Sequence, residues 1–248
     1  MGTRLKEETE FKPKPMVEIG ENPILWHIMK IYAHYGFRDF ILALGFKGNY
    51  IKDYFVKRKY YTSDFTINTA KREVSNIGYN NRFEKDNFDI TFSDTGLETA
   101  HGERVLKLKK YINNDLFMVT YGDGVSDIDL DLLLAHHRKM GKLATVTGVH
   151  PMTRFGELEV ENGLVKEFRE KPQVRTGMIN GGFFVFQRGV FDYLTESCSL
   201  EKEPLENLAR DGQLAIYRHE GFWHCMDTYR DMENLNAFWA SGEAPWKK

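Results

Sequence analysis

Residues 2–5, Gly-Thr-Arg-Leu, and residues 12–16, Lys-Pro-Lys-Pro-Met, form the stretch on which the interpretation of the fold depends. Glycine lets a backbone approach a ligand closely, arginine offers a planar fork of donors, and lysine offers a compact positive charge. The two prolines fix the path of the chain between the lysines. A loop of this composition is typical of a polyphosphate-binding segment, and such a loop normally follows a buried strand.

Only Met1 precedes this loop, so the sequence contains no strand in that position. The strand would lie in the middle of a sheet, where about four buried aliphatic residues would contribute roughly 1.5–3 kcal/mol each. That sum is comparable with a whole domain's stability of about 5–15 kcal/mol. We therefore expect either that the native protein begins roughly ten residues earlier, or that another segment fills the gap.

Strands and helices alternate after the loop. Asn22 and Pro23 predict a helix start, with asparagine as N-cap and proline in the first position, and Gly36 predicts its end. The apolar run within 39–44 predicts a buried parallel strand. Further helices are predicted at 49–57, 103–112, 129–140, 203–210 and 231–239, and further strands at 65–68, 88–92, 116–121, 144–150, 156–160, 164–168 and 182–186.

The second half of the chain contains more strands than the first. Asn162 and Gly163 form a hairpin-turn signal between two of them, whereas residues 70–87 are polar and irregular. The order of elements predicts an α/β fold with a doubly wound, mostly parallel, Rossmann-like sheet and a small antiparallel addition. We expect one domain over residues 1–248.

Composition narrows the function classes. Hydrophobic residues make up 42% of the chain, enough for a core, and the net charge of −2 argues against a nucleic-acid-binding domain or a polybasic membrane module. Cys198 and Cys225 are expected to be free thiols. No apolar run is long enough to span a membrane, and no signal peptide is present, so we expect a cytoplasmic protein without a membrane partner.

Two aspartates are candidate metal ligands, although each has a simpler explanation. Asp123 lies in Tyr-Gly-Asp-Gly-Val at 121–125, directly after the strand predicted at 116–121, where ligands bind in such a sheet. Turns use aspartate and glycine constantly, so the motif alone is weak. Asp227, in Met-Asp-Thr at 226–228, precedes a predicted helix and taken alone is more often an N-cap.

Over nearly its whole length the sequence resembles the sugar-1-phosphate nucleotidylyltransferases, whose usual opening is a strand followed by G-G-x-G-T-R-L and K-P-K-P. The first strand and the first two glycines of that opening are absent here. The resemblance rests, besides the opening loop, on segments 12–20 (KPKPMVEIG), 23–29 (PILWHIM), 121–125 (YGDGV), 154–156 (RFG), 170–172 (EKP), 180–184 (NGGFF) and 226–228 (MDT).

The resemblance implies a role for each candidate residue. Arg4 and Lys14 would act on the triphosphate as catalytic residues, and Asp123 and Asp227 would bind Mg²⁺, which takes few protein ligands. The other implied nucleotide-binding residues are Gly2, Thr3, Thr95, Gly96, Arg104 and Gly122. The implied sugar-phosphate-binding residues are Glu170, Lys171, Asn180 and Gly181.

Several segments of the candidate site have other interpretations or depart from the family pattern. Residues 170–172 alone read as a charged turn, and 180–182 as a tight turn before a strand. Gly102-Glu103-Arg104 stands where the family usually has Gly-Gly-Arg, which places a carboxylate near the base-reading loop. Trp223 either borders the sugar site or packs in the core.

The implied reaction is attack of a sugar 1-phosphate on the α-phosphorus of a nucleoside triphosphate, without a covalent intermediate. The resemblance favours CTP and α-D-glucose 1-phosphate as substrates and CDP-glucose and pyrophosphate as products. It also implies that CDP-glucose is used for the synthesis of surface polysaccharide. The alternatives are an enzyme that uses UTP or dTTP, and an inactive nucleotide-sugar-binding or regulatory homologue. We also expect a homo-oligomer, with residues 238–246 as an interface or a packed tail.

Overall fold

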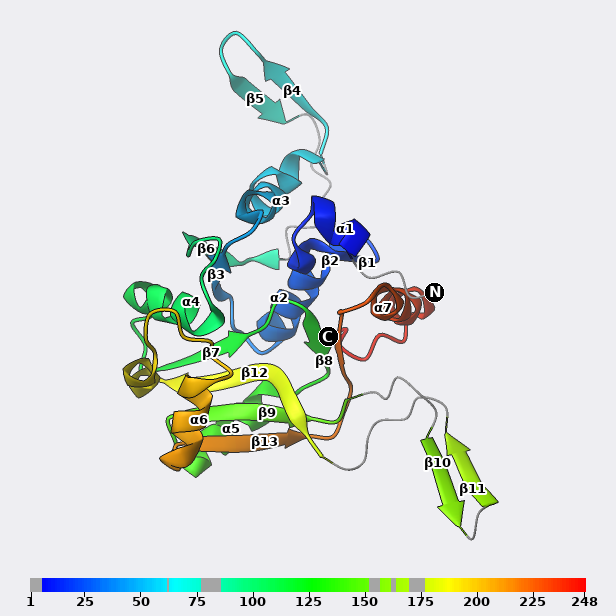
Figure 1. The fold of residues 1–248 in the computed structure, drawn as a ribbon. Helices are drawn as coiled ribbons and strands as arrows, with labels where there is room; N and C mark the ends of the chain where they lie inside the picture. The colour runs from blue at the N-terminus through cyan, green and yellow to red at the C-terminus, as the bar shows by residue number, and fades with distance from the viewer. Residues whose placement is uncertain (1–5, 62, 77–85, 152–156, 162–163, 170–176) are drawn as a thin grey trace.

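The computed structural model describes residues 6–61, 63–76, 86–151, 157–161, 164–169 and 177–248 of the chain. Figure 1 shows helices arranged around a central group of strands, with two hairpins that extend away from the body. No helix in the described ranges combines the length and the apolar character that crossing a membrane requires.

The largest sheet has four strands in the order β13-β9-β12-β7. Strand β13 (Leu214–His219) runs parallel to β9 (Ala144–Val149). Strand β12 (Ile179–Gln187) runs antiparallel both to β9 and to β7 (Leu116–Thr120). Three of the four strands therefore share one direction, and β12 is reversed between two of them.

Helices cover both faces of this sheet. Along β12, Phe183 and Val185 belong to one buried cluster, and Phe184 and Phe186 belong to another, as the two-residue period of a strand requires. The first cluster includes residues of α2 (Ile24–His34), α5 (Leu130–Met140) and α7 (Tyr229–Ser241), and the second those of α4 (His101–Leu108) and α6 (Glu203–Arg210). This arrangement confirms the predicted doubly wound α/β fold.

Strand β3 (Asp39–Leu44) pairs in parallel with β6 (Asp89–Asp94), as predicted, but it is buried only in part. Leu44 is buried, whereas Phe40 is half-buried and Ala43 is exposed. Among the described residues, β3 pairs only with β6, and β7 pairs only with β12. Strands β3 and β7 therefore each have one edge without a described partner, and side chains near that edge stay partly accessible.

Helix α2 begins one residue later than predicted. Asn22 and Pro23 form the short strand β2 (Asn22–Pro23), which pairs with β1 (Glu18–Ile19), and Pro23 occupies the N-cap position in an extended conformation. The Asn22 side chain does not cap the helix because its Oδ1 accepts a hydrogen bond from Arg58 at 2.9 Å. Gly36, with a φ of 87°, follows the helix end as predicted.

Two antiparallel hairpins project from the body (Figure 1). One joins β4 (Phe65–Asn68) to β5 (Glu73–Asn76), so part of the segment predicted to be irregular is a strand. The other joins β10 (Glu157–Glu161) to β11 (Leu164–Arg169), in agreement with the predicted hairpin, although Asn162 and Gly163 lie outside the described residues.

The remaining elements of the described chain include two short paired strands. Strands β8 (Gly124–Ser126) and β14 (Trp223–Cys225) pair in an antiparallel manner and lead into the site described below. The sequence did not predict β8, β13 or β14. The other elements are α1 (Lys6–Phe11), η1 (Lys14–Met16), α3 (Gly48–Tyr61), η3 (Lys109–Tyr111) and η4 (Arg188–Tyr193).

Candidate active site

A lysine and two aspartates from three distant segments meet beyond the C-terminal end of β7. The Lys14 Nζ donates to Asp123 Oδ2 at 2.6 Å and to Asp227 Oδ1 at 2.5 Å. Lys14 belongs to η1, Asp123 lies between β7 and β8, and Asp227 lies between β14 and α7. The structure therefore brings together three of the predicted site residues, and we call Asp123 and Asp227 the acidic pair.

Local sequence explains how Lys14 reaches the acidic pair. Pro13 holds an extended conformation before η1, and Pro15 lies inside the turn. The Pro15 ring packs on Gly122, where an added Cβ would lie 3.0 Å from Pro15 Cγ. Gly122 thus allows the turn that carries Asp123 to pack closely against the turn that carries Lys14.

The charges of these three groups stabilise one another. Burial alone would lower the pKa of the Lys14 ammonium, but its two carboxylate partners raise it above the ordinary value. The hydrogen bond from Lys14 lowers the pKa of Asp227. At neutral pH Lys14 is therefore a cation and Asp227 an anion.

Asp227 is fixed by its neighbours at the start of α7. Its backbone N–H donates to Asp231 Oδ2 at 3.1 Å, and its Oδ2 accepts from the Cys225 thiol at 3.1 Å. Burial and the bond to Asp227 raise the pKa of Cys225 to about 12, so the thiol stays a donor. The N-cap of α7 is Thr228, in a capping box with Asp231. The Asp227 side chain is therefore not the cap and faces Lys14.

The acidic pair fits a magnesium site in its geometry. A single ammonium contacts both carboxylates, which shows that they converge on one cation. In the part of the chain that the structure describes, no cluster of three or more His, Cys, Asp or Glu side chains is arranged to hold a metal ion. A two-carboxylate site with water and ligand oxygens in the other positions is the kind that Mg²⁺ occupies.

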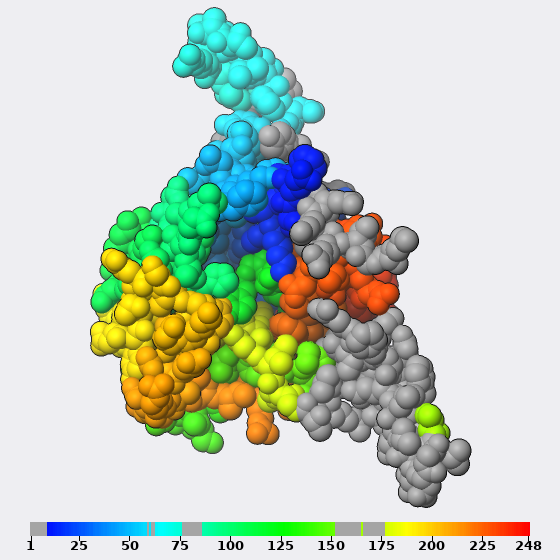
Figure 2. Space-filling view, in the orientation of Figure 1, coloured from blue at the N-terminus to red at the C-terminus, as the bar shows by residue number. Residues whose placement is uncertain are grey.

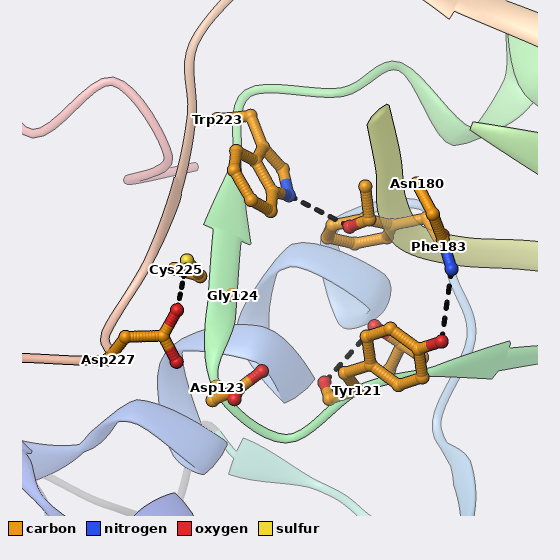
Figure 3. A pocket seen from close by; sticks show the side chains of 10 residues that line it. Tyr121, Asp123, Gly124, Asn180, Phe183, Trp223, Cys225 and Asp227 are labelled. Carbon is orange, nitrogen blue, oxygen red and sulfur yellow. Dashed lines mark hydrogen bonds between the residues drawn. The ribbon is translucent and has the colours of Figure 1, made fainter. Parts of the chain in front are cut away.

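A cavity of about 190 Å³ adjoins the acidic pair. This volume is below the about 300–1,000 Å³ of pockets for larger ligands, so it suits a single small ring. In the space-filling view, this face is hollowed where blue, green, yellow and orange-red segments meet (Figure 2). The cavity is lined by Thr120, Tyr121, Asp123, Gly124, Asn180, Gly181, Phe183, Trp223, Cys225 and Asp227 (Figure 3).

Asn180 lines the cavity on the side away from Cys225 (Figure 3), and the neighbouring Gly181 lines the cavity as well. The pairing of β12 with β9 is interrupted between Asn180 and Phe184, which turns this part of the strand toward the cavity. Gly181 O accepts a hydrogen bond from Trp223 Nε1 at 2.8 Å. Trp223 therefore both borders the cavity and packs in the core.

Thr95, Gly96 and Arg104 do not line this cavity. The Arg104 guanidinium donates to Thr95 Oγ1 at 2.5 Å and to the backbone oxygens of Leu44 and Leu97, each at 3.2 Å. Arg104 thus braces the loop after β6 from within. The nucleotide contacts predicted for these three residues stay a prediction.

Glu103, which departs from the usual family pattern, is directed away from this loop. Its carboxylate accepts from Ser197 N at 3.0 Å and pairs with Lys107 at 2.8 Å. The Lys107 Nζ in turn donates to Thr95 O at 2.9 Å. The carboxylate therefore joins α4 to the segment before α6, and its partner Lys107 links it to the loop.

The remaining predicted site residues lie outside the described residues: Gly2, Thr3, Arg4, Glu170 and Lys171. Sequence reasoning missed Tyr121 and Cys225, which line the cavity, and Glu201, whose carboxylate accepts a hydrogen bond from the Tyr121 hydroxyl at 2.6 Å. Tyr121 precedes the Gly-Asp-Gly motif and Cys225 lies two residues before Asp227, so proximity to a motif could have pointed to both.

Comparisons with known proteins identify the family of the chain. A family model described as nucleotidyl transferase matches residues 1–241. A probable glucose-1-phosphate cytidylyltransferase of Bacillus subtilis is 45% identical over 248 residues, which are 99% of this chain and 95% of that protein. The glucose-1-phosphate cytidylyltransferase of Salmonella typhi is 45% identical over 249 residues, covering 100% of this chain and 95% of its own length.

Solved structures support the fold. HddC from Yersinia pseudotuberculosis superposes with a TM-score of 0.69 at 22% identity, covering 96% of this chain and 95% of its own. An apo UDP-glucose pyrophosphorylase superposes with a TM-score of 0.65 at 16% identity, covering 95% of this chain and 93% of its own. At these identities the likeness concerns the fold alone.

Proposed function

The chain belongs to the nucleotidyl transferase family, and from this membership we propose that it transfers a cytidylyl group from CTP to glucose 1-phosphate. The products would be CDP-glucose and pyrophosphate. The observation that carries the proposal is the alignment, over almost the whole chain, with the glucose-1-phosphate cytidylyltransferases of Bacillus subtilis and Salmonella typhi.

The proposed reaction is a single displacement at phosphorus. An oxygen of the sugar phosphate forms a bond to the α-phosphorus of CTP, and the bond from that phosphorus to the bridging oxygen breaks. Pyrophosphate leaves with the bonding electrons. Because both substrates are anions, positioning and charge neutralisation would supply most of the rate enhancement.

We assign the charged and polar residues of the site to neutralising and positioning the two substrates. Lys14 and Arg4 would neutralise the triphosphate together with the loop residues Gly2 and Thr3, and Lys171 would pair with the sugar phosphate. Asn180, Gly181 and Glu170 would contact the sugar. The position of Lys14 at the acidic pair and of Asn180 and Gly181 on the cavity wall supports this division.

The acidic pair would hold Mg²⁺ as the cofactor. When bound, the ion would act as a Lewis acid and as a template for phosphate oxygens. We expect EDTA to abolish turnover and added Mg²⁺ to restore it. Asp227→Asn should raise the Mg²⁺ concentration needed for half-maximal activity by about tenfold, since it removes one anionic ligand. Equal Mg²⁺ requirements in variant and wild type would exclude this assignment.

The nucleotide preference is tested by incubating the purified protein with glucose 1-phosphate, Mg²⁺ and CTP, UTP, dTTP or GTP in turn. We expect pyrophosphate release with CTP at a kcat/KM at least about tenfold above that with any other nucleotide, roughly what one base-reading hydrogen bond supplies. Preference for UTP or dTTP would replace the cytidylyl assignment. CDP-glucose binding in calorimetry without any turnover would instead identify a binding or regulatory protein.

The cytoplasmic location, the homo-oligomer and the link to surface polysaccharide stay predictions. Gel filtration with light scattering would test the oligomer.

A further inference from the structure

A chain of hydrogen bonds enters the cavity from the segment before α6. The Tyr121 hydroxyl donates to Glu201 Oε1 at 2.6 Å, and Asn180 Nδ2 donates to the Tyr121 hydroxyl at 3.0 Å (Figure 3 shows the latter bond). Glu201 is further held by Ser199, which donates to Oε2 at 2.8 Å, and by His101, whose Nδ1 lies 3.1 Å from Oε1. Tyr121 and Asn180 line the cavity, whereas Glu201, Ser199 and His101 do not.

The anionic end of the chain sets the direction of every bond in it. Burial alone would raise the pKa of Glu201, but hydrogen bonds from Tyr121 and Ser199 bring it to about 2, so the group is a carboxylate. A carboxylate only accepts hydrogen bonds, so the Tyr121 hydroxyl must donate to it. The phenol oxygen must then accept a hydrogen bond from Asn180. Only the Nδ2 of the Asn180 amide can donate that bond, because Oδ1 is an acceptor.

The opposite end of the same amide is fixed as well. Asn180 Oδ1 accepts from the backbone N–H of Gly182 at 2.8 Å. One N–H and one oxygen lone pair of Asn180 are left after these two bonds. A sugar hydroxyl both donates and accepts, so the orientation of this amide decides which of its groups a hydroxyl meets.

The Tyr121 ring is held independently of its hydroxyl. Gly182 has a φ of 77°, and a Cβ there would lie 2.4 Å from Tyr121 Cδ2, so the ring rests directly on the glycine backbone. The ring also packs edge-on against Phe184 with centroids 5.6 Å apart. Removing only the hydroxyl should therefore leave the ring in place.

From these contacts we infer that Glu201 is a positioning residue for the sugar side of the site, acting through the Tyr121 hydroxyl to fix the orientation of the Asn180 amide. This inference rests on the proposed function, because it names the sugar as the group that the amide meets. Without the carboxylate, the phenol could donate to Asn180 instead, and only the Gly182 N–H would then hold the amide in its present orientation. Selectivity for one sugar hydroxyl would then fall.

The test uses Tyr121→Phe and Glu201→Ala in the full-length protein, assayed with CTP, Mg²⁺ and glucose 1-phosphate or its 2-, 3-, 4- and 6-deoxy analogues. Wild type should lose kcat/KM by about tenfold or more with one analogue, the size of one hydrogen bond. In both variants that penalty should shrink severalfold, while KM for glucose 1-phosphate rises about tenfold and KM for CTP stays within about twofold.

Tyr193→Phe is the matched control, because Tyr193 also donates to a carboxylate, that of Asp211 at 2.9 Å, but does not line the cavity. It should leave both KM values and the analogue pattern unchanged. Unchanged analogue penalties in Tyr121→Phe and Glu201→Ala would overturn the inference, even if both variants lose stability.

Failure of the proposed function can be told apart from failure of this inference. If wild type releases no pyrophosphate from CTP and glucose 1-phosphate, the function fails, and the hydrogen-bond chain is then tested in the free protein by NMR. The Asn180 side-chain amide, assigned by its loss in Asn180→Asp, should exchange with solvent severalfold faster in Tyr121→Phe than in wild type. Equal exchange rates would overturn the positioning role.

Discussion

Lys14 lies between two carboxylates, so a substitution there changes the charge of the whole cluster. Lys14→Met keeps the length of the side chain but removes the ammonium that contacts both members of the acidic pair and that we assign to the triphosphate. We expect kcat/KM with CTP and glucose 1-phosphate to fall by about 10²–10³, the range for removing one preorganised charge-stabilising group. Steady-state kinetics at saturating Mg²⁺ would measure this loss.

Lys57→Met is the control for Lys14→Met. Lys57 forms an exposed ion pair with Asp53, four residues earlier in α3, at 2.8 Å. Such a pair contributes little, about 0.3–0.5 kcal/mol, so kcat/KM should stay close to wild type. If Lys14→Met retained more than about a third of wild-type kcat/KM, the catalytic assignment of Lys14 would be wrong.

His27 makes the free energy of unfolding depend on pH. Burial lowers its pKa to about 4, although the bond to Ile19 O opposes this shift. Between about pH 6.5 and 4 the unfolded chain therefore binds more protons than the folded chain, and stability falls as the pH falls through this window. For a pKa difference of this size the loss amounts to about 3 kcal/mol.

Urea unfolding of wild type and His27→Gln from pH 7 to pH 4 measures this effect. The stability difference between the two proteins should change by about 3 kcal/mol across the window, because carboxyl groups contribute equally to both. His34→Gln, which changes an exposed histidine at the end of the same helix, is the matched control. Parallel curves for His27→Gln would show that His27 is not the group responsible.

At the scale of elements, helix α4 packs closely against the segment before α6. Gly102 is buried, and an added Cβ would lie 2.5 Å from Cys198 Sγ and 2.9 Å from Cys198 O. Alanine normally stabilises a helix by about 1 kcal/mol relative to glycine. Here we expect Gly102→Ala to destabilise the protein by about 1–3 kcal/mol, because the backbone carbonyl must move.

Chemical denaturation of Gly102→Ala and of the double variant Gly102→Ala/Cys198→Ala would test this close contact. The double variant removes the sulfur but not the carbonyl. Gly102→Ala should therefore lower the free energy of unfolding less in the Cys198→Ala background than in wild type, but it should still lower it. A single variant as stable as wild type, or more stable, would mean that α4 does not approach the 198–200 segment so closely.

The sequence predicted long elements better than short ones. Helices α5 and α6 begin and end within one residue of the predicted bounds, since Asp129 caps α5 through Leu132 N and Gly141 ends it. Strands β8 and β14 have three residues each and depend on pairing with each other, which no local pattern reveals. The polar strand β5 forms for the same reason, through its pairing with β4.

At the scale of the whole molecule, the site residues that could be predicted were those that belong to a family motif. Lys14 lies 109 and 213 positions from the members of the acidic pair, and the resemblance alone assigned all three to one site. Glu201 lies 80 positions from Tyr121 and belongs to no motif. A carboxylate in a polar segment is normally a surface group, so its role depends on packing that the sequence does not express.

The C-terminal segment closes the molecule on its N-terminal half. Trp246 is 2% exposed, and its ring stacks on Phe222 with centroids 5.4 Å apart. Its Nε1 donates to Nδ1 of His27 at 3.4 Å. Of the two alternatives for residues 238–246, this contact supports a packed tail, and it places the tail in the same buried cluster as α2 and α7.

Trp246→Ala should therefore lower the free energy of unfolding by about 3–5 kcal/mol, the usual cost of truncating a buried tryptophan. Trp246→Phe should lose less, because it keeps a ring beside Phe222 and loses only the N–H bond to His27. Phe238→Ala is the control within the same tail: Phe238 is 38% exposed, so its loss should be well below that of Trp246→Ala. Thermal and urea unfolding would rank the three variants, and a Trp246→Ala protein within about 1 kcal/mol of wild type would show that the tail packs on the body without stabilising it.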